Sequence, residues 1–386
     1  MSKVTISDAI RYIGCDDHDI DLFESQYDVP NGVSYNSYLI LDDKIAIMDT
    51  VDKRVTDEWF GNLETELAGR TPDYLVVSHL EPDHASNIQK ACEKYSDMKV
   101  VTNAKTVGML PQFFDIDLTD RIIEVKEGDT LELGNHTLTF VMAPMVHWPE
   151  VMVEYESTEK ILFSADGFGK FGTLDTDEDW DCEARRYYMN IVGKYGAPVQ
   201  TLLKKAAALD IQTICPLHGP ILDSDLGHYI EKYNIWSSYE PENEGVTLVY
   251  GSIHGNTAAA ARKLAEILEG KGQKVSVFDL SRDDMAEAIE DAFRYDKLIV
   301  ACATYDGALF PCVEDFLYHL KIKNYQKRKI GFMENGSWAP MAGKLMKAYA
   351  ESFKGCTIVE PVVTIKSVMK EDTVSAMEEL ADAMLK

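Results

Sequence analysis

Residues 78–87 read SHLEPDHASN, a short stretch that holds several side chains able to bind metal ions. The four candidates are His79, Glu81, Asp83 and His84. A purely structural interpretation also exists, because Asp83 with Ser86 could cap a helix that begins near Asn87. Pro82 suits the entry of such a helix. The rest of the chain has to decide between a metal site and a helix start.

Length and composition limit the class of protein. A chain of 386 residues suggests two or three domains, and 46% hydrophobic residues can build ordinary cores. The formal charge of −27 and the pI near 4.7 argue against nucleic acid as a partner, because phosphate binding needs a basic surface. We therefore expect a solvated acidic surface.

The chain is expected to be cytoplasmic and free of membrane. Its N-terminus lacks an apolar run with a small-residue cleavage site, and no stretch of about 18 apolar residues occurs. The seven cysteines are scattered and never spaced CxxC, which predicts reduced thiols. The same spacing argues against a rubredoxin-like or zinc-ribbon module in this chain.

The first part of the chain alternates short strands with turns and helices. A hairpin is predicted to turn at Asp42-Asp43 and another at Gly134-Asn135. A helical stretch is expected at about 182–208. This order predicts two sheets covered by helices. The polar segment 237–246 marks a boundary, so we predict domains 1–243 and 244–386.

The second part repeats a strand, a glycine-containing loop and a helix. The strands VTLVY, KVSVFDL, KLIVACATY, KIGFMENG and TIVEPVVTI predict a doubly wound parallel sheet of flavodoxin-like size. Three of its loops are expected to meet at one edge of that sheet and to bind a cofactor. The loop residues are Ser252, Ile253, His254, Gly255, Asn256, Thr257, Thr304, Tyr305, Asp306, Gly307, Asn335, Gly336, Ser337 and Trp338.

These loops favour FMN. The first lies between a strand and a helix, where backbone N–H groups can hold a phosphate, and it lacks the GK[ST] of nucleoside triphosphatases. Tyr305 and Trp338 can stack on an isoalloxazine ring. An ordinary glycine-rich turn is the alternative for the first loop taken alone. All three loops resemble those of flavodoxin, although ENGSWAP departs from the commoner third-loop forms.

Further candidate ligands follow separate predicted strands of the first part. His79 ends DYLVVSH, His147 follows TFVMAPMV, Asp166 ends ILFSAD and His218 follows TICPL. In an α/β architecture, sites assemble where strands end. The inventory of four imidazoles and three carboxylates suits iron, zinc or manganese, and their charge suits two divalent ions.

The spacing of the first stretch also favours a metal pair. In an extended loop, His79, Glu81 and Asp83 point one way by period two, whereas Asp83 and His84 diverge. One loop can therefore address two metal ions, and a carboxylate such as Asp166 can bridge them.

HxExDH, HWPE, SADGFG and CPLHGP resemble the motifs of the metallo-β-lactamase fold. Hydrolases of that fold usually carry histidine where this chain has Glu81. The glutamate form, fused to a flavodoxin-like domain, resembles the flavodiiron proteins (A-type flavoproteins) across about residues 33–350. The resemblance implies a metallo-β-lactamase-like αββα sandwich followed by the flavodoxin-like domain.

The resemblance implies two iron ions per chain. It assigns His79, Glu81 and His147 to one ion, Asp83, His84 and His218 to the other, and Asp166 to both. The gap between Asp166 and His218 looks shorter than usual in the family. His228 lies ten residues further on, but His218 is preferred because it follows a strand in the PLHGP setting. Tyr195 is the candidate catalytic hydrogen-bond donor, with core packing as its alternative.

The family activity implied is reduction of dioxygen to water, of nitric oxide to nitrous oxide, or both. Rubredoxin or a reduced deazaflavin is the implied electron donor, and a head-to-tail homodimer or a dimer of dimers is the implied assembly. Two alternatives stay open: a zinc-dependent hydrolase with an attached flavodoxin domain, and a non-enzymatic electron carrier with a structural metal half.

Overall fold

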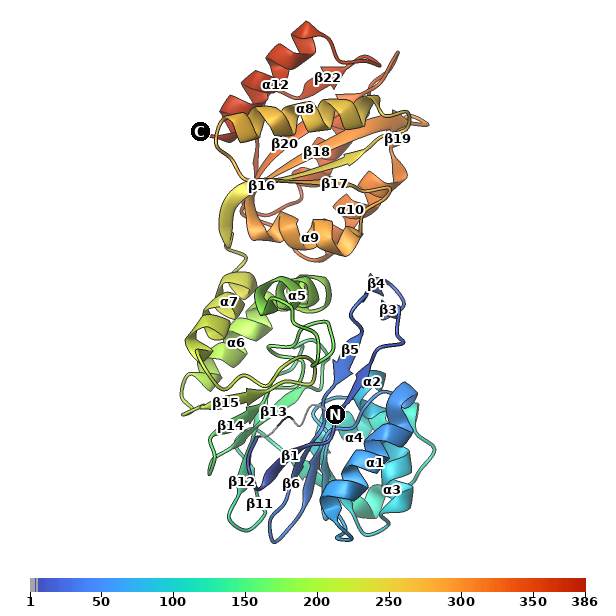
Figure 1. Cartoon of the computed structure of the whole chain (residues 1–386), viewed down its shortest axis with the longest axis vertical. Coiled ribbons are helices and arrows are strands. Elements are labelled where there is room, and N and C mark those ends of the chain that lie inside the picture. The colour runs from blue at the N-terminus through green and yellow to red at the C-terminus, as the bar shows by residue number, and fades with distance from the viewer. Residues whose placement is uncertain (1–3, 5) are drawn as a thin grey trace. The chain divides into compact units, whose positions relative to one another are not determined.

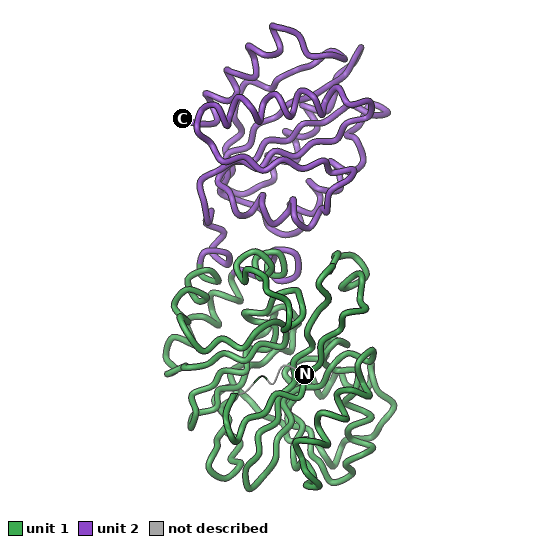
Figure 2. Tube along the Cα trace, in the orientation of Figure 1, with its two compact units in different colours: residues 1–188, 197–234 green, residues 189–196, 235–386 purple. Residues whose placement is uncertain are grey.

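The computed structural model describes residue 4 and residues 6–386. The chain forms two compact units (Figure 2). The first comprises residues 1–188 and 197–234, and the second comprises residues 189–196 and 235–386. Residues 189–196 therefore belong to the second unit, although the residues on either side of them belong to the first. The domain division at 243/244 stays a prediction.

The first unit is built on two sheets (Figure 1). The six-stranded sheet has the order β1 (Ile10–Tyr12), β6 (Tyr38–Ile40), β7 (Ala46–Met48), β8 (Tyr74–Val76), β9 (Lys99–Asn103), β10 (Ile122–Val125). The five-stranded sheet has the order β11 (Thr130–Glu132), β12 (Thr137–Met142), β13 (Met152–Glu156), β14 (Ile161–Phe163), β15 (Thr213–Cys215). Two further pairs join β2 (Cys15–Asp17) to β5 (Val33–Tyr35) and β3 (Leu22–Phe23) to β4 (Tyr27–Asp28).

Both predicted hairpins form, and the two sheets share one core. The pairs β6–β7 and β11–β12 are antiparallel, as expected for the turns at Asp42-Asp43 and Gly134-Asn135. Val76 and Val101 of the first sheet belong to the same buried cluster as Phe140 of the second. Strands buried in this way are rich in β-branched and aromatic residues, because these side chains pack well on a pleated surface.

Helices cover the outer faces of this sandwich (Figure 1). On the first sheet lie α1 (Thr56–Leu67), α3 (Ile88–Lys94) and α4 (Ala104–Phe113), with the short α2 (Pro82–Ala85) and the 3₁₀ turns η1 (Lys53–Val55) and η2 (Thr119–Arg121). On the second lie α5 (Trp180–Tyr187), α6 (Gly196–Ala206) and α7 (Leu226–Ser238). The predicted αββα sandwich is confirmed.

The helix expected at about 182–208 is interrupted. It is divided by the π turn η3 (Tyr188–Val192) and the 3₁₀ turn η4 (Gly193–Tyr195). Two glycines and Pro198 lie at the break, and glycine and proline are the poorest residues for a helix interior. The interrupted part, residues 189–196, is the segment that groups with the second unit.

The second unit is a doubly wound sheet, as predicted. Its order is β17 (Val275–Asp279), β16 (Asn243–Gly251), β18 (Tyr295–Tyr305), β20 (Lys329–Asn335), β21 (Thr357–Ile358), with β22 (Val363–Ile365) also on β20 and β19 (Ala308–Leu309) on β18. Its helices are α8 (Asn256–Gly270), α9 (Met285–Arg294), α10 (Pro311–Ile322), α11 (Ala342–Ala350) and α12 (Glu371–Met384). The predicted last strand is split, because Pro361 has no N–H to donate to a ladder.

Among the described residues, no helix combines the length and the apolar character that a membrane crossing needs.

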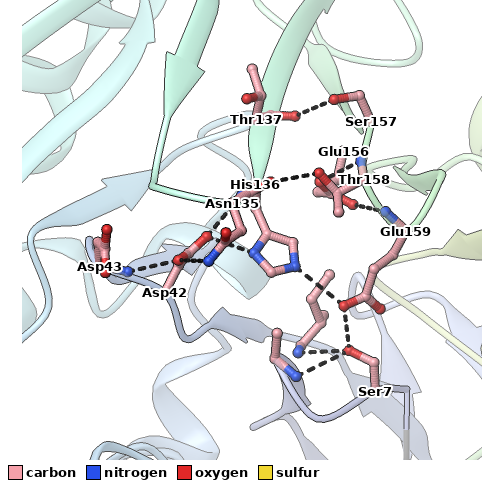
Figure 3. Close-up of polar contacts among 12 residues, drawn as sticks. Ser7, Asp42, Asp43, Asn135, His136, Thr137, Glu156, Ser157, Thr158 and Glu159 are labelled. Atoms are coloured by element: carbon pink, nitrogen blue, oxygen red, sulfur yellow. Dashed lines mark hydrogen bonds and ion pairs between the residues drawn. The ribbon is translucent and has the colours of Figure 1, made fainter.

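A network of polar side chains centred on His136 links turns of the two sheets of the first unit (Figure 3). His136 Nδ1 lies 2.7 Å from Asp42 Oδ2, and His136 Nε2 lies 3.2 Å from Glu159 Oε1. Ser7 Oγ donates to the same Glu159 oxygen at 2.9 Å. Burial opposes a charge on His136, but the hydrogen bonds to Asp42 and Glu159 outweigh it and raise the pKa of the ring. The imidazolium therefore ties turns of both sheets to the start of the chain.

The His136 network should make the free energy of unfolding depend on pH. Because the folded pKa of His136 is raised, its stabilisation is complete below the ordinary value of 6.5 and is lost as pH rises through the folded pKa. We expect His136→Gln to lower the free energy of unfolding by about 1–2 kcal/mol at about pH 6 and by much less at about pH 9. Urea unfolding at both pH values measures the difference. His18→Gln, at an exposed histidine, is the control, and an equal loss at both pH values would contradict the expectation.

Candidate metal centre and flavin site

The residues predicted at strand ends come from both sheets of the first unit. His79 follows β8, His147 follows β12, Asp166 follows β14 and His218 follows β15. β14 and β15 are parallel neighbours, so Asp166 and His218 leave the second sheet at the same edge. The distances between their side-chain atoms show that all four converge with the 79–84 stretch.

Residues 78–87 form a cluster of candidate ligands and also contain the start of a helix. Ser78 lies in a bend, residues 79–81 have no regular secondary structure, and α2 begins at Pro82 with the proline in its first turn. Asp83 is therefore placed by a helical turn, and the prediction of a fully extended loop is wrong. Ligand atoms of His79, Glu81 and Asp83 still lie within 4.8 Å of one another. α3 has Asn87 as its N-cap without a capping side chain.

One group of ligand atoms consists of Asp83, His84 and His218. The Nε2 atoms of His84 and His218 are 3.2 Å apart. Asp83 Oδ2 lies 3.2 Å from His218 Nε2 and 3.7 Å from His84 Nε2. Both histidines are fully buried. This group can hold one ion with two nitrogen ligands and one oxygen ligand.

A second group consists of His79, Glu81, His147 and Asp166. His147 Nε2 lies 2.8 Å from Glu81 Oε2 and 3.2 Å from Asp166 Oδ2. His79 Nε2 lies 3.5 Å from Asp166 Oδ2 and 3.8 Å from Glu81 Oε2. Its ligand types again suit a transition-metal ion.

Several of these atoms are buried without a hydrogen-bond partner among the described residues. They are His79 Nδ1 and Nε2, Asp83 Oδ1, and both carboxylate oxygens of Asp166. Buried polar atoms that lack hydrogen bonds are unfavourable, and a metal ion can satisfy them. The donor set therefore fits two cations, with Asp166, which contacts His79 and His147, as the carboxylate that both ions could share.

The predicted cofactor loops of the second unit follow neighbouring strands. They begin after β16, β18 and β20, which lie side by side in the sheet. In the first loop, Gly255 has φ +85° at the start of α8, a conformation that favours glycine. Ser252 Oγ accepts a hydrogen bond from its N–H at 3.1 Å. The N-terminus of α8 is thus a suitable cradle for a phosphate.

Hydrogen bonds tie the three loops together. Asn335 Nδ2 donates to Thr257 Oγ1 at 3.3 Å, and Thr304 Oγ1 accepts from Met341 N at 3.0 Å. Tyr305 and Trp338 expose 45% and 92% of their surface, so both rings are free to stack on a ligand. The predicted residues of all three loops therefore lie at one edge of the sheet.

A fourth loop at this edge was missed. Ser367, which follows β22, accepts a hydrogen bond from Asn335 Nδ2 through its carbonyl oxygen at 3.0 Å. Its hydroxyl lies 2.6 Å from that of Ser337. Only the parallel sheet order, which places β22 beside β20, brings this serine to the edge.

Known proteins resemble both units. Residues 33–219 match the model described as ODP family beta lactamase, and residues 248–379 match that of flavodoxin. A nitric oxide reductase of Moorella thermoacetica is 30% identical, with 98% of this chain and 96% of the relative covered. An anaerobic nitric oxide reductase flavorubredoxin of Aliivibrio salmonicida is 28% identical, over 87% of this chain and 69% of its own. The rubredoxin oxygen:oxidoreductase of Desulfovibrio gigas superposes with a TM-score of 0.91 at 25% identity, covering 98% of this chain and 96% of that one.

The chain belongs to the flavodiiron family. It is an oxidoreductase and a flavoprotein of an iron-binding family, as the resemblance implied. The hydrolase alternative is not favoured, because the relatives with named activities are reductases.

Aromatic rings that sequence reasoning missed surround His218 in this flavodiiron protein. The ring centroids of Phe23, Tyr35 and Tyr187 lie 5.5, 5.9 and 5.5 Å from that of His218. Burial, reinforced by the charge of Asp166, raises the pKa of Tyr187 well above its usual value, so its hydroxyl stays protonated. The only available signal was the double tyrosine at 187–188, and helical period alone does not tell which ring faces the cluster.

The remaining candidates lie elsewhere. Tyr195 is in η4, which groups with the second unit, and its ring is contacted by the ammonium of Lys194 at 5.8 Å. Its catalytic role stays a prediction. His228 lies on α7 and pairs with Asp181 at 2.6 Å, as expected for a helix-surface residue rather than a ligand.

Burial and mutual charge separate the pKa values of the ligand groups. Burial opposes a charge on His79, but the carboxylate of Asp166 outweighs it and raises the pKa to about 10. Burial likewise opposes a charge on His147, yet the adjacent carboxylates of Asp166 and Glu81 raise its pKa well above the usual value. Burial lowers the pKa of His84 to about 4. Without metal ions, the protein therefore holds protons on His79 and His147 near neutral pH.

Metal binding should displace these protons. Ligation needs neutral imidazoles and ionised carboxylates, and the pKa values of His218 and Glu81 are raised too, that of Glu81 to about 7 by burial. Adding Zn²⁺ to metal-free protein at about pH 7 should therefore release at least roughly two protons per chain, and affinity should rise with pH. An indicator dye in weak buffer measures the release. His147→Ala should release roughly one proton fewer. Binding without proton release would contradict the protonation of this pair.

Proposed function

We propose that this flavodiiron protein reduces dioxygen to water, nitric oxide to nitrous oxide, or both, at two iron ions supplied with electrons by FMN. The observation that carries the proposal is the buried cluster of seven ligand groups, several of them with unpartnered atoms, at one edge of the sandwich. The named activities of relatives support it.

Each of the two proposed metal positions has its own set of side chains. His79, Glu81 and His147 would hold one iron ion, and Asp83, His84 and His218 the other. Asp166, whose carboxylate has no hydrogen-bond partner among the described residues, would be shared by both ions. When bound, FMN and a ferrous pair supply together the four electrons that dioxygen needs, or the two that a pair of nitric oxide molecules needs.

Other residues shape the pocket. The rings around His218 exclude water, which keeps the local dielectric low and strengthens electrostatic interactions there. The protonated hydroxyl of Tyr187 is available as a hydrogen-bond donor on the same side. We include Tyr195 as a second candidate donor.

The electron source and the assembly follow by family analogy. We propose rubredoxin or a reduced deazaflavin as the external donor. A head-to-tail homodimer, or a dimer of dimers, would bring the FMN of one subunit to the metal pair of the other. The free cysteines of the described chain agree with a cytoplasmic location, which we also propose.

The first experiment measures metal and flavin content, then follows anaerobic reoxidation of the reduced protein by each gas. Two irons and one FMN per chain, with rapid reoxidation, are the expected result and rank the two gases. Two zinc ions with slow reoxidation would point to the hydrolase.

Asp166→Asn tests the bridge. Because the amide carries no charge and has a single acceptor oxygen, the variant should lose iron, and reoxidation should slow at least about 100-fold. Asp181→Asn is the matched control, since that carboxylate pairs with His228 outside the cluster. Full iron content and full rate in Asp166→Asn would refute the assignment.

Trp338→Ala tests the flavin site. Loss of a stacking partner worth about 0.5–1.5 kcal/mol should weaken FMN binding roughly 2- to 10-fold. The exposed ring contributes little to stability, so the fold should persist. Fluorescence titration of flavin-free protein measures the change. Tyr318→Ala, at another exposed aromatic on α10, should bind FMN normally.

A further inference from the structure

The two halves of the ligand cluster differ in how their histidines are supported. His218 Nδ1 lies 2.8 Å from the carbonyl oxygen of Ser34, and His84 Nδ1 lies 3.3 Å from that of Thr50. Each ring can therefore donate its Nδ1–H to the backbone and present Nε2 to a metal. His79 Nδ1, in the other half, has no hydrogen-bond partner among the described residues.

The supported half already has the spacing of a metal site. Two imidazole nitrogens that bind one tetrahedral ion at about 2.0–2.1 Å are about 3.3 Å apart. The Nε2 atoms of His84 and His218 are 3.2 Å apart. In the other half, His147 Nε2 and Glu81 Oε2 are only 2.8 Å apart, which is the distance of a direct hydrogen bond. A tetrahedral ion would need these two atoms to move apart by about 0.5 Å.

A buried asparagine fixes the loop that carries His218. Asn36 is fully buried, and its Nδ2 donates to the carbonyl oxygens of Pro216 and Gly219, both at 2.8 Å. Its side-chain oxygen accepts from the hydroxyl of Tyr12 at 3.0 Å. The amide therefore spans the loop on both sides of the histidine with all its polar atoms engaged.

Other groups of residues 34–38 also hydrogen-bond to the loop 216–219, and together with the Asn36 side chain they form what we call the His218 clamp. The N–H of Asn36 donates to the carbonyl oxygen of Leu217 at 2.8 Å. Ser34 Oγ accepts from the N–H of Gly219 at 2.7 Å, and Tyr38 donates to the carbonyl oxygen of Pro216 at 2.5 Å. The backbone of residues 216–219 is thereby held in one conformation before any ion binds.

We propose that Asp83, His84 and His218 form the tighter of the two metal positions, and that Asn36 is the positioning residue that makes it so. The inference rests on the proposed function, since it concerns the same metal pair. Asn36 acts through the backbone of the His218 loop and does not touch the ion.

The test is a Co²⁺ titration of the metal-free full chain, followed by the visible absorption of the bound ion. Wild-type protein should bind two ions in two phases whose affinities differ at least about tenfold. His218→Ala should remove the tighter phase, and His147→Ala should remove the weaker one. Asn36→Ala should weaken the tighter phase roughly 10- to 100-fold and change its absorption spectrum.

Two further variants separate positioning from general destabilisation. Tyr12→Phe leaves the hydrogen bonds of Asn36 to the loop in place but removes the donor to the Asn36 side-chain oxygen, so it should weaken the tighter phase by a smaller factor. This variant still tests the inference if Asn36→Ala fails to fold. Asn135→Ala removes a hydrogen bond to the carboxylate of Asp42 at the β11–β12 turn, outside the His218 loop, and should leave both phases unchanged.

The outcomes are distinguishable. Two equal phases in wild type, loss of the tighter phase in His147→Ala, or a tighter phase unaltered in both Asn36→Ala and Tyr12→Phe would overturn the inference and leave the proposed function standing. Failure of the wild-type chain to bind two ions would instead overturn the proposed function.

Discussion

The structure of the first unit depends on bringing seven ionisable side chains together in a buried place. Among the residues that the structure describes, no lysine or arginine forms an ion pair with them. Desolvation of such groups is expensive, and their mutual contacts offset it only in part. The unfavourable desolvation free energy is offset by burial of apolar side chains in the core between the two sheets. The cluster therefore costs folding free energy, and bound cations would offset that cost.

The architecture explains why the ligands come from distant parts of the sequence. Each strand ends at a fixed edge, so a short loop beyond the strand is enough to place a side chain there. The segment after β8 delivers four of these side chains, His79 and Glu81 from its loop and Asp83 and His84 from the first turn of α2. The hydrogen bonds from Asn36 to the loop 216–219 hold the backbone on both sides of His218 in place.

Much of this was accessible from the sequence. His79, His147, Asp166 and His218 were predicted because each follows a buried apolar run. The three cofactor loops were predicted because strand and helix alternate strictly in the second unit. Prediction failed where the outcome depended on tertiary contacts. The helical turn at Asp83, the break near Pro198 and the proximity of Tyr187 to His218 all depend on partners far away in sequence.

The segment 189–196 has a consequence for how this protein can be divided. It precedes the last strand of the first unit in sequence, yet its packing partners belong to the second. Asn190 Nδ2 donates to the carbonyl oxygen of Ala286 at 3.2 Å, and Tyr239 donates to that of Gly193 at 2.8 Å. The two units are therefore interleaved in sequence, and any single cut between residues 197 and 243 separates residues 189–196 from the unit with which they pack.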